Sequence, residues 1–359
     1  MTNTQASMLL ISTLVLAILL TWCVRWYALR QGVIDIPNAR SSHAIPTPRG
    51  GGLGMVLAFG AGIVYLIFSN ALPAAYDPFM YALLCSGSAL AVVGFVDDHG
   101  GVPVRVRLLV HISAASLLVW ATGRLAPVDF GFGPVDLGVF AYPIAVLGIV
   151  WILNLTNFMD GIDGLAGGQA VLASGLAAGF IYFSTSNLPA AIPAALLAAS
   201  ALGFLILNFP PAKIFMGDVG SGALGFALGC LLAVAIWRSL EARPALSSAL
   251  LLALPVSAFL VDATLTLAGR ILRGERWWTP HVQHAYQATA RQVGHGRVTM
   301  GYLGWTLLAC VIAVLARSQS DFFVAALVAI WFTLGAVLWR RLRRWAQVRE
   351  SAVGSRNSA

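Results

Sequence analysis

The sequence predicts an all-α fold, a polytopic membrane bundle of about eleven transmembrane helices. Hydrophobic residues make up 59% of the 359 positions and charged residues only 10%, against roughly a quarter charged in ordinary soluble domains. A chain this poor in polar groups cannot cover a water-exposed surface, so lipid is its expected solvent. Apolar runs long enough to cross a bilayer recur at 8–27, 51–68, 79–96, 107–122, 137–155, 169–185, 189–207, 217–237, 247–268, 299–316 and 321–339.

The first run, 8–27, is expected to remain in the protein as a helix, because no positively charged segment precedes it and no cleavage signal follows it. The runs 169–185 and 189–207 are joined by a short Ser/Asn/Pro turn and should form a helical hairpin. The four cysteines lie inside apolar runs without metal-ligand spacing, so buried thiols are expected and disulfides are not.

The basic residues predict the orientation of the chain. Counted with the nearest loop, 18 of the 22 lie on one side of the membrane, and the other four are Arg124, Arg238, Arg243 and Arg317. Because positive residues favour the cytoplasmic side, the N-terminus is expected outside and the C-terminus in the cytoplasm. Basic residues spread over short loops argue against nucleic acid as a partner. One transmembrane domain is expected over 1–339, followed by a basic cytoplasmic tail over 340–359.

Chemistry is expected on the cytoplasmic face, where polar residues gather against the composition. In the first loop, Arg49 precedes three glycines and follows two prolines. Such a loop could bring backbone and guanidinium to phosphate oxygens, although a plain turn explains it equally well. In the second loop, Asp97 and Asp98 are adjacent at a membrane edge, where repulsion and desolvation are costly. A divalent cation, or a phosphate bound through one, would relieve that cost; a mere helix-end marker is the alternative.

In the third loop, Asn157, Asp160 and Asp163 recur every three residues. On a continuous helix they would fan apart, so they converge only if the helix ends near Gly161 and Gly164. Their amide and carboxylate oxygens suit Mg²⁺. A calcium loop is disfavoured because no glutamate closes it at the expected position.

The fourth loop holds the sole lysine of the chain, Lys213, five residues before Asp218. Lys213 could neutralise a phosphate, although it could also serve only as a topology charge. Phe215 could stack on a base, and Asp218 could bind a metal where the next helix begins.

The fifth and longest loop is rich in arginine and histidine. His281 and His284 are spaced to share one helix face. No thiol accompanies them, which disfavours zinc, and the clustered basic groups suit a multiply charged ligand such as a nucleotide diphosphate. Just before this loop, Asp262 is expected about 12 Å inside a helix. An intramembrane carboxylate is a functional candidate by default, with a structural partner to a neighbouring helix as the alternative.

Taken in order, these loops resemble the polyprenyl-phosphate N-acetylhexosamine-1-phosphate transferase family, of glycosyltransferase family 4 type. Two motifs carry the resemblance: Asn-x-x-Asn-x-x-Asp-Gly-x-Asp-Gly-Leu over 154–165 and Phe-Met-Gly-Asp-x-Gly-Ser over 215–221. The resemblance implies transfer of a sugar-1-phosphate from a UDP-linked N-acetylated sugar to undecaprenyl phosphate, with release of UMP. It also implies Mg²⁺, with Mn²⁺ as a substitute, and a bacterial inner membrane.

The matched motifs imply roles for individual residues. Asp97 and Asp98 would form the lipid-phosphate site and supply a candidate base, and Asp218 would be the principal Mg²⁺ ligand. Phe215 would lie beside the uracil. The pyrophosphate and metal region would be shaped by Asn157, Asp160 and Asp163. The donor's phosphate or sugar would be contacted by His281 and His284.

The segment 281–287 departs from the triple-histidine element of the peptidoglycan branch, which transfers phospho-MurNAc-pentapeptide. It is more similar to a branch that initiates O-antigen or capsule chains with GlcNAc or 6-deoxy sugars such as FucNAc and QuiNAc. Peptidoglycan synthesis remains the alternative within the family, and a membrane transporter the alternative from another class. Transporters often show repeated halves with midplane sites, whereas here the polar clusters lie on one face. The exact sugar and a homodimeric state are left open.

Overall fold

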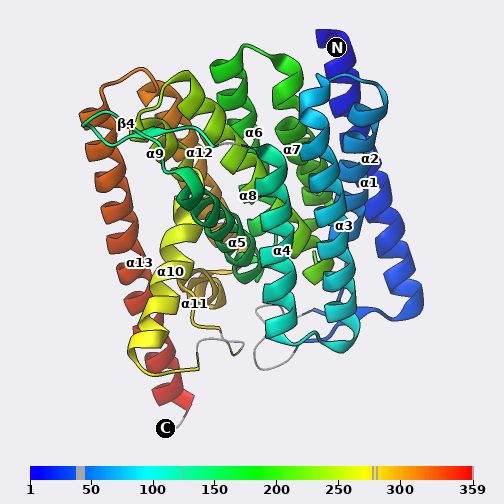
Figure 1. The fold of residues 1–359 in the computed structure, drawn as a ribbon. Coiled ribbons are helices and arrows are strands. Elements are labelled where there is room, and N and C mark those ends of the chain that lie inside the picture. Colours follow the sequence, from blue (N-terminus) through cyan, green and yellow to red (C-terminus); the bar gives the residue numbers. More distant parts are fainter. Residues whose placement is uncertain (38–44, 124, 277–278, 280–281, 358–359) are drawn as a thin grey trace.

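The computed structural model describes residues 1–37, 45–123, 125–276, 279 and 282–357. Its helices form a bundle with the two termini at opposite ends (Figure 1). The helices are α1 (Asn3–Gln31), α2 (Gly52–Phe68), α3 (Asp77–Gly100), α4 (Val104–Thr122), α5 (Ala141–Met159), α6 (Leu165–Thr185), α7 (Leu188–Asn208), α8 (Asp218–Ala242), α9 (Leu246–Ala253), α10 (Ser257–Leu272), α11 (Ala285–Val293), α12 (His295–Ala316) and α13 (Asp321–Asn357).

The prediction of an all-α membrane bundle is confirmed, but its count of eleven spans is not. In the described part of the chain, nine helices are long and apolar enough to cross a membrane. A tenth span results if α9 and α10, which meet at an 80° bend, are counted as one. The apolar helix α2 has only 17 residues. Helix α13 runs without a break past residue 339, so the division at 339/340 remains a prediction.

The other regular elements are short. Two antiparallel hairpins are formed by β1 (Ile34–Asp35) with β2 (Thr47–Pro48) and by β3 (Val128–Asp129) with β4 (Pro134–Val135). Single 3₁₀ turns, η1 (Ala74–Tyr76) and η2 (Gly138–Phe140), lead into α3 and α5. The expected hairpin of α6 and α7 is present, and Asn187 caps α7 by accepting a hydrogen bond from the Ala190 N–H.

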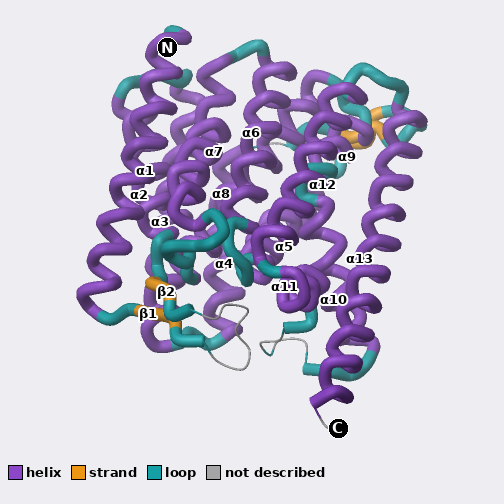
Figure 2. Tube along the Cα trace, turned by 180° about the vertical axis from the view of Figure 1, so that it is seen from behind, coloured by secondary structure: helices purple, strands orange, loops and turns teal. Residues whose placement is uncertain are grey.

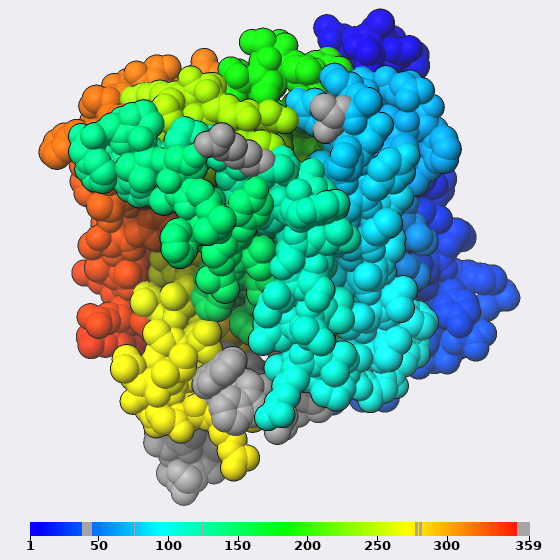
Figure 3. Space-filling model, in the orientation of Figure 1, coloured from blue at the N-terminus to red at the C-terminus, as the bar shows by residue number. Residues whose placement is uncertain are grey.

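Helix α8 lies at the centre of the bundle and packs against α2, α3, α5 and α6. Its small residues permit this, because glycine lets helix backbones approach closely in membranes. A Cβ added at Gly220 would lie only 2.6 Å from the Gly52 Cα of α2. At the surface, α5 is set back between α4 and α10 (Figure 3). The close contact between Gly220 and Gly52 fixes the first turn of α8 in place, and this turn carries Asp218.

The bend between α9 and α10 is stabilised from inside the bundle. The buried Gln169 of α6 donates a hydrogen bond to the Pro255 carbonyl at the break. The Gln169 carbonyl oxygen in turn accepts from the Thr306 hydroxyl of α12, at 2.8 Å. The polar groups of the break are thus satisfied within protein, as a membrane interior requires.

Candidate active site

A cavity of about 300 Å³ lies at the end of the bundle where the C-terminus emerges. Hairpin β1–β2, helix α11 and the loops after α5 and α7 gather at this end (Figure 2). The cavity brings together six of the eleven residues predicted from the sequence: Arg49, Asn157, Asp160, Asp163, Phe215 and Asp218.

Arg49 is placed by main-chain hydrogen bonds on both sides. The Phe215 N–H donates to the Pro48 carbonyl, and the Gly51 N–H donates to the Phe215 carbonyl, each at 2.8 Å. The segment after α7 thus continues the β1–β2 hairpin as a third extended strand-like segment. This pairing fixes Arg49 beside the start of α8.

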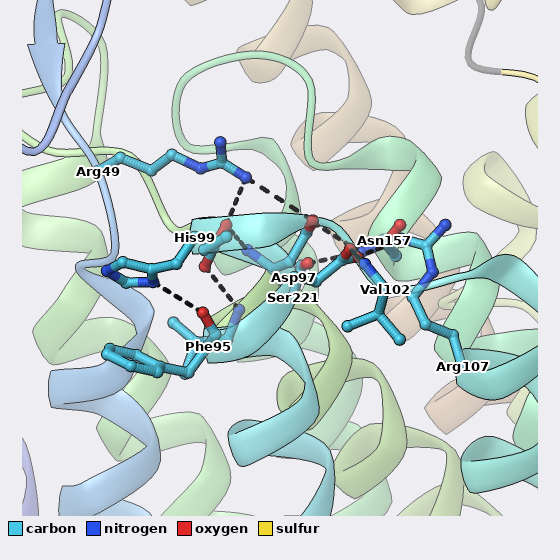
Figure 4. A network of polar contacts seen from close by, with 11 residues as sticks. Arg49, Phe95, Asp97, His99, Val102, Arg107, Asn157 and Ser221 are labelled. Atoms are coloured by element: carbon cyan, nitrogen blue, oxygen red, sulfur yellow. Dashed lines mark hydrogen bonds and ion pairs between the residues drawn. The ribbon is translucent and has the colours of Figure 1, made fainter.

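Asp98 of α3 caps the N-terminus of α8. Its carboxylate accepts hydrogen bonds from the N–H groups of Asp218, at 3.0 Å, and Val219, at 3.1 Å. It also forms an ion pair with Arg49, whose Nη2 lies 3.7 Å from Asp218 Oδ2 (Figure 4). The positive end of the helix dipole and the guanidinium both stabilise this buried carboxylate.

Gly94 makes the approach of α3 to α8 geometrically feasible. A Cβ at this position would lie 2.6 Å from the Asp218 carbonyl carbon and 2.7 Å from the Val219 Cα. Both are backbone atoms that have no flexible side chain to move aside. Gly94 is one helical turn before Asp98, so the two share a face of α3.

Asn157 connects the last turn of α5 to the first turn of α8. Its amide Nδ2 donates to the Ser221 hydroxyl at 2.8 Å and to Asp218 Oδ1 at 3.3 Å (Figure 4). Helix α5 ends at Met159, which confirms the expected helix end before Gly161. Beyond this end, the chain turns Asp160 into the cavity.

Asp160 and Asp163 differ in their electrostatic surroundings. Burial, together with the nearby Asp218 carboxylate, raises the pKa of Asp160 well above its ordinary value. Burial would also raise the pKa of Asp163, but hydrogen bonds from His295 and the Ala212 N–H outweigh it, and the net pKa is lowered. The His295 Nδ1 lies 2.9 Å from Asp163 Oδ1, and the Ala212 N lies 2.9 Å from Oδ2. Asp163 therefore ties its loop to α12 and to the segment after α7.

Four predicted residues that the structure describes do not line this cavity: Asp97, Asp98, Lys213 and His284. Asp97 turns away from Asp98, binds Arg107 of α4 and accepts from the Val102 N–H at 2.5 Å (Figure 4). Lys213 is exposed, and its carbonyl accepts from Arg25 of α1. His284 is buried beside Asp262. His281 lies outside the described residues, and its role remains a prediction.

The cavity also contains residues for which the sequence predicted no individual role, among them Asp35, Asn208, Gln287 and His295. Asn208 ends α7, and its amide joins two loops by accepting from the Gly164 N–H and donating to the Ile214 carbonyl. Asp35 had no sequence signal beyond its place in the first loop. Its pairing opposite Thr47 in the hairpin brings it close to Arg49.

The donor set fits a magnesium ion shared with substrate. Mg²⁺ is usually held by one or two carboxylates together with phosphate oxygens. Asp160 and Asp218 supply two carboxylates close enough for one to raise the pKa of the other. Within the described residues, no group of three or more His, Cys, Asp or Glu side chains could hold a metal ion. An ion at this site would take its remaining oxygen ligands from water or from a bound phosphate.

The chain is similar to known proteins over most of its length. A family model described as "Glycosyl transferase family 4" matches residues 80–236. A probable undecaprenyl-phosphate N-acetylglucosaminyl 1-phosphate transferase of Bacillus subtilis (strain 168) is 31% identical over 286 residues, covering 77% of this chain and 76% of the relative. The chain belongs to the polyprenyl-phosphate N-acetylhexosamine-1-phosphate transferase family. Family membership confirms the resemblance that the loop motifs carried.

Other members of this transferase family differ in their named substrates. A decaprenyl-phosphate N-acetylglucosaminephosphotransferase of Mycobacterium tuberculosis (strain H37Rv) is 32% identical over 301 residues, covering 76% of this chain and 72% of the relative. A phospho-N-acetylmuramoyl-pentapeptide-transferase of Picosynechococcus is 32% identical over 251 residues, covering 64% and 65%. Both a GlcNAc-type and a peptidoglycan-type relative are thus similar to this chain.

Proposed function

We propose that the protein transfers an N-acetylhexosamine 1-phosphate from a UDP-sugar to a polyprenyl phosphate in a Mg²⁺-dependent reaction. The observation that carries this proposal is the convergence of Arg49, Asn157, Asp160 and Asp218 on one cavity at one end of a membrane bundle. A site with carboxylates and an arginine suits a phosphate-rich donor bound together with a cation.

The reaction exchanges one phosphoanhydride for another. An oxygen of the lipid phosphate attacks the phosphorus that bears the sugar, the bond from this phosphorus to the UMP oxygen breaks, and UMP departs. A phosphate monoester has a second pKa near 6, so at neutral pH the acceptor is mostly dianionic. Deprotonation then supplies little driving force, and positioning and charge neutralisation should dominate.

The residues of the cavity divide this work. Asp218 and Asp160 would hold Mg²⁺, which when bound neutralises charge on the diphosphate. Arg49 offers a second positive group beside Asp218. Asp98 accepts two N–H groups and pairs with Arg49, and these contacts support a positioning role for Asp98 more than that of a base. Phe215 lies on the cavity wall, where it can flank the uracil.

For the sugar, we propose GlcNAc or a 6-deoxy-N-acetylhexosamine, and for the pathway the initiation of O-antigen or a related envelope polysaccharide. The segment 281–287 supports this choice over peptidoglycan synthesis, because it lacks the triple histidine. We further propose that the cavity faces the cytoplasm of a bacterial inner membrane. The basic residues of 340–344 support this orientation, because the C-terminus emerges at the cavity end (Figure 2).

The test is transfer of radiolabelled UDP-GlcNAc, and of a panel of other UDP-sugars, to lipid in membranes that contain the protein. Label should enter butanol-extractable lipid, UMP should suppress it, and membranes with the Asp218→Asn variant should lack it. Labelling only from the UDP-MurNAc-pentapeptide donor would shift the assignment to peptidoglycan synthesis. Vesicle uptake without lipid labelling would show a transporter instead.

A further inference from the structure

Asp262 is a buried carboxylate inside a membrane helix. It lies in α10 with its side chain 2% exposed, in surroundings where a charge without partners would be strongly unfavourable. It lines a second, largely apolar cavity of about 270 Å³ between α10, α11, α12 and α13, and is not among the described residues around the catalytic cavity. A substrate in the catalytic cavity would therefore not touch it.

Five hydrogen-bond donors among the described residues surround this carboxylate, and the His284 Nδ1 lies 3.5 Å from its Oδ1. Two are main-chain groups of α11: the Ala285 N–H donates to Oδ1 at 2.9 Å and the Tyr286 N–H to Oδ2 at 3.0 Å. These are among the first N–H groups of the helix, which have no partner within it. Asp262 therefore caps α11 from a different helix, and the cap is charge-assisted.

The other three donors are side chains from three helices: Thr266 of α10 at 3.2 Å, Tyr302 of α12 at 2.8 Å and Trp339 of α13 at 3.1 Å. All five groups donate, so both carboxylate oxygens are used as acceptors. An asparagine amide would turn an NH₂ group toward donors alone. The arrangement thus requires a carboxylate and not only a polar residue.

Helix α11 joins this cluster to the catalytic cavity. The Tyr286 hydroxyl donates to the Phe158 carbonyl at 2.8 Å, directly before the loop that carries Asp160. A Cβ at Gly161 would lie 3.0 Å from Gln287 Nε2, so Gln287 contacts the same loop. Gln287 lines the catalytic cavity, and its Oε1 has no hydrogen-bond partner among the described residues.

We infer that Asp262 is a positioning residue for sugar transfer. By anchoring the first two N–H groups of α11, it holds this helix against the loop 158–161 and presents Gln287 to the donor. Its effect on the reaction rests on the proposed function; the anchoring of α11 does not.

The test compares Asp262→Asn with Ser257→Ala in the purified full-length protein. Ser257 is a matched control, because it is also a buried residue of α10 and accepts from Trp305 and Trp331 of the flanking helices, at 3.0 and 2.9 Å, whereas no α11 group among the described residues is hydrogen-bonded to it. Asp262→Asn should speed hydrogen–deuterium exchange of the peptide 285–293 and leave the central helix α8 protected. It should raise KM for the UDP-sugar about tenfold, as expected for a lost charge-assisted bond, with KM for the lipid little changed. Ser257→Ala should do neither.

Unchanged exchange in 285–293, or equal effects on both substrates, would overturn the inference. If Asp262→Asn does not fold, Tyr286→Phe is the second variant, because it removes only the bond to Phe158. Tyr286→Phe should raise the KM for the UDP-sugar severalfold, and an unchanged KM in this variant would also overturn the inference. An inactive wild-type protein would refute the proposed function alone, because the exchange measurement would still decide whether Asp262 anchors α11.

Discussion

Asp98 and Asp218 are 120 residues apart in the chain, yet the Asp98 carboxylate accepts a hydrogen bond from the main-chain N–H of Asp218 at 3.0 Å. The same carboxylate pairs with Arg49, whose Nη2 also lies 3.7 Å from Asp218 Oδ2. The acidic residue of α3 thus sets the position both of the first turn of α8 and of the arginine beside it.

Asp98→Asn should reduce transfer far more than Asp97→Asn, although the two residues are neighbours. The first change removes the charge that fixes Arg49, and loss of one aligned electrostatic group typically lowers turnover about 10²-fold or more. The second breaks only the contact with Arg107 outside the cavity and should lower stability by about 1–3 kcal/mol with a modest effect on rate. Steady-state kinetics and thermal unfolding of both variants measure this; comparable rate losses would place Asp97 in the chemistry.

Asp218→Asn should lower the rate of transfer by about 10³-fold or more, while the protein remains folded. Asparagine keeps the shape of the side chain. It loses the ion pair with Arg49 and the small benefit of a negative charge at a helix N-terminus, the latter roughly 0.3–1 kcal/mol. Ser221→Ala, which removes the other acceptor of Asn157, is the matched control and should retain most activity. Wild-type rates in Asp218→Asn would rule out this residue as the metal ligand.

Without metal, stability should fall as the pH rises. The pKa of Asp160 is raised in the folded protein by burial and by Asp218. Between the ordinary carboxyl value of about 4 and this raised value, the folded state holds a proton that the unfolded state has released, so stability decreases with pH. Mg²⁺ should replace the proton and remove the loss. Thermal unfolding in EDTA and in Mg²⁺ across this range is the measurement, with Asp160→Asn expected to flatten the curve. An unfolding temperature that changes neither with pH nor with Mg²⁺ would contradict a carboxylate pair that binds metal. Transfer activity that persists in EDTA would contradict it as well.

Gln287→Ala should raise KM for the UDP-sugar several-fold with little change in KM for the lipid, because Gln287 lines the catalytic cavity from the α11 side. Gln283→Ala is its control, since Gln283 lies just before α11 but is bonded to Arg273 and Glu275. Kinetics with each substrate varied in turn distinguish the two variants. Equal sensitivity of the two variants would indicate a general effect on the segment 283–287.

The sequence was most informative where chemistry and spacing acted together. The hydropathy of the runs predicted the membrane bundle, and the three-residue spacing of Asn157, Asp160 and Asp163 predicted a helix end that the structure shows at Met159. The directions of adjacent residues were harder to predict. Asp97 and Asp98 differ by about 100° around a helix, and the sequence did not show which one faced α8. Gly94, one turn before Asp98, was the available signal, because a glycine there marks the closely packed face.

The positions of Asp35 and His295 in the cavity could not be predicted in this way. Asp35 reaches the cavity because it pairs with Thr47 in a hairpin whose two strands have only two residues each. Strands this short, inside a polar loop, have no periodic sequence pattern that could be detected. His295 is brought to Asp163 by the packing of α12, across 132 residues of chain. Both placements depend on tertiary contacts between distant segments, which local spacing does not encode.

Beside the site, the helices meet main chain to main chain, because Gly94 meets the backbone of α8 and Gly52 meets Gly220. Substitutions at these glycines would push the helices apart, whereas α11 contributes to the cavity the side chain of Gln287, which can be exchanged. An inhibitor that depends on the position of Asp218 would consequently leave few routes to resistance through changes at these glycines. A redesign of sugar preference should begin at Gln287, where a change leaves the helix contacts at Gly94 and Gly52 undisturbed.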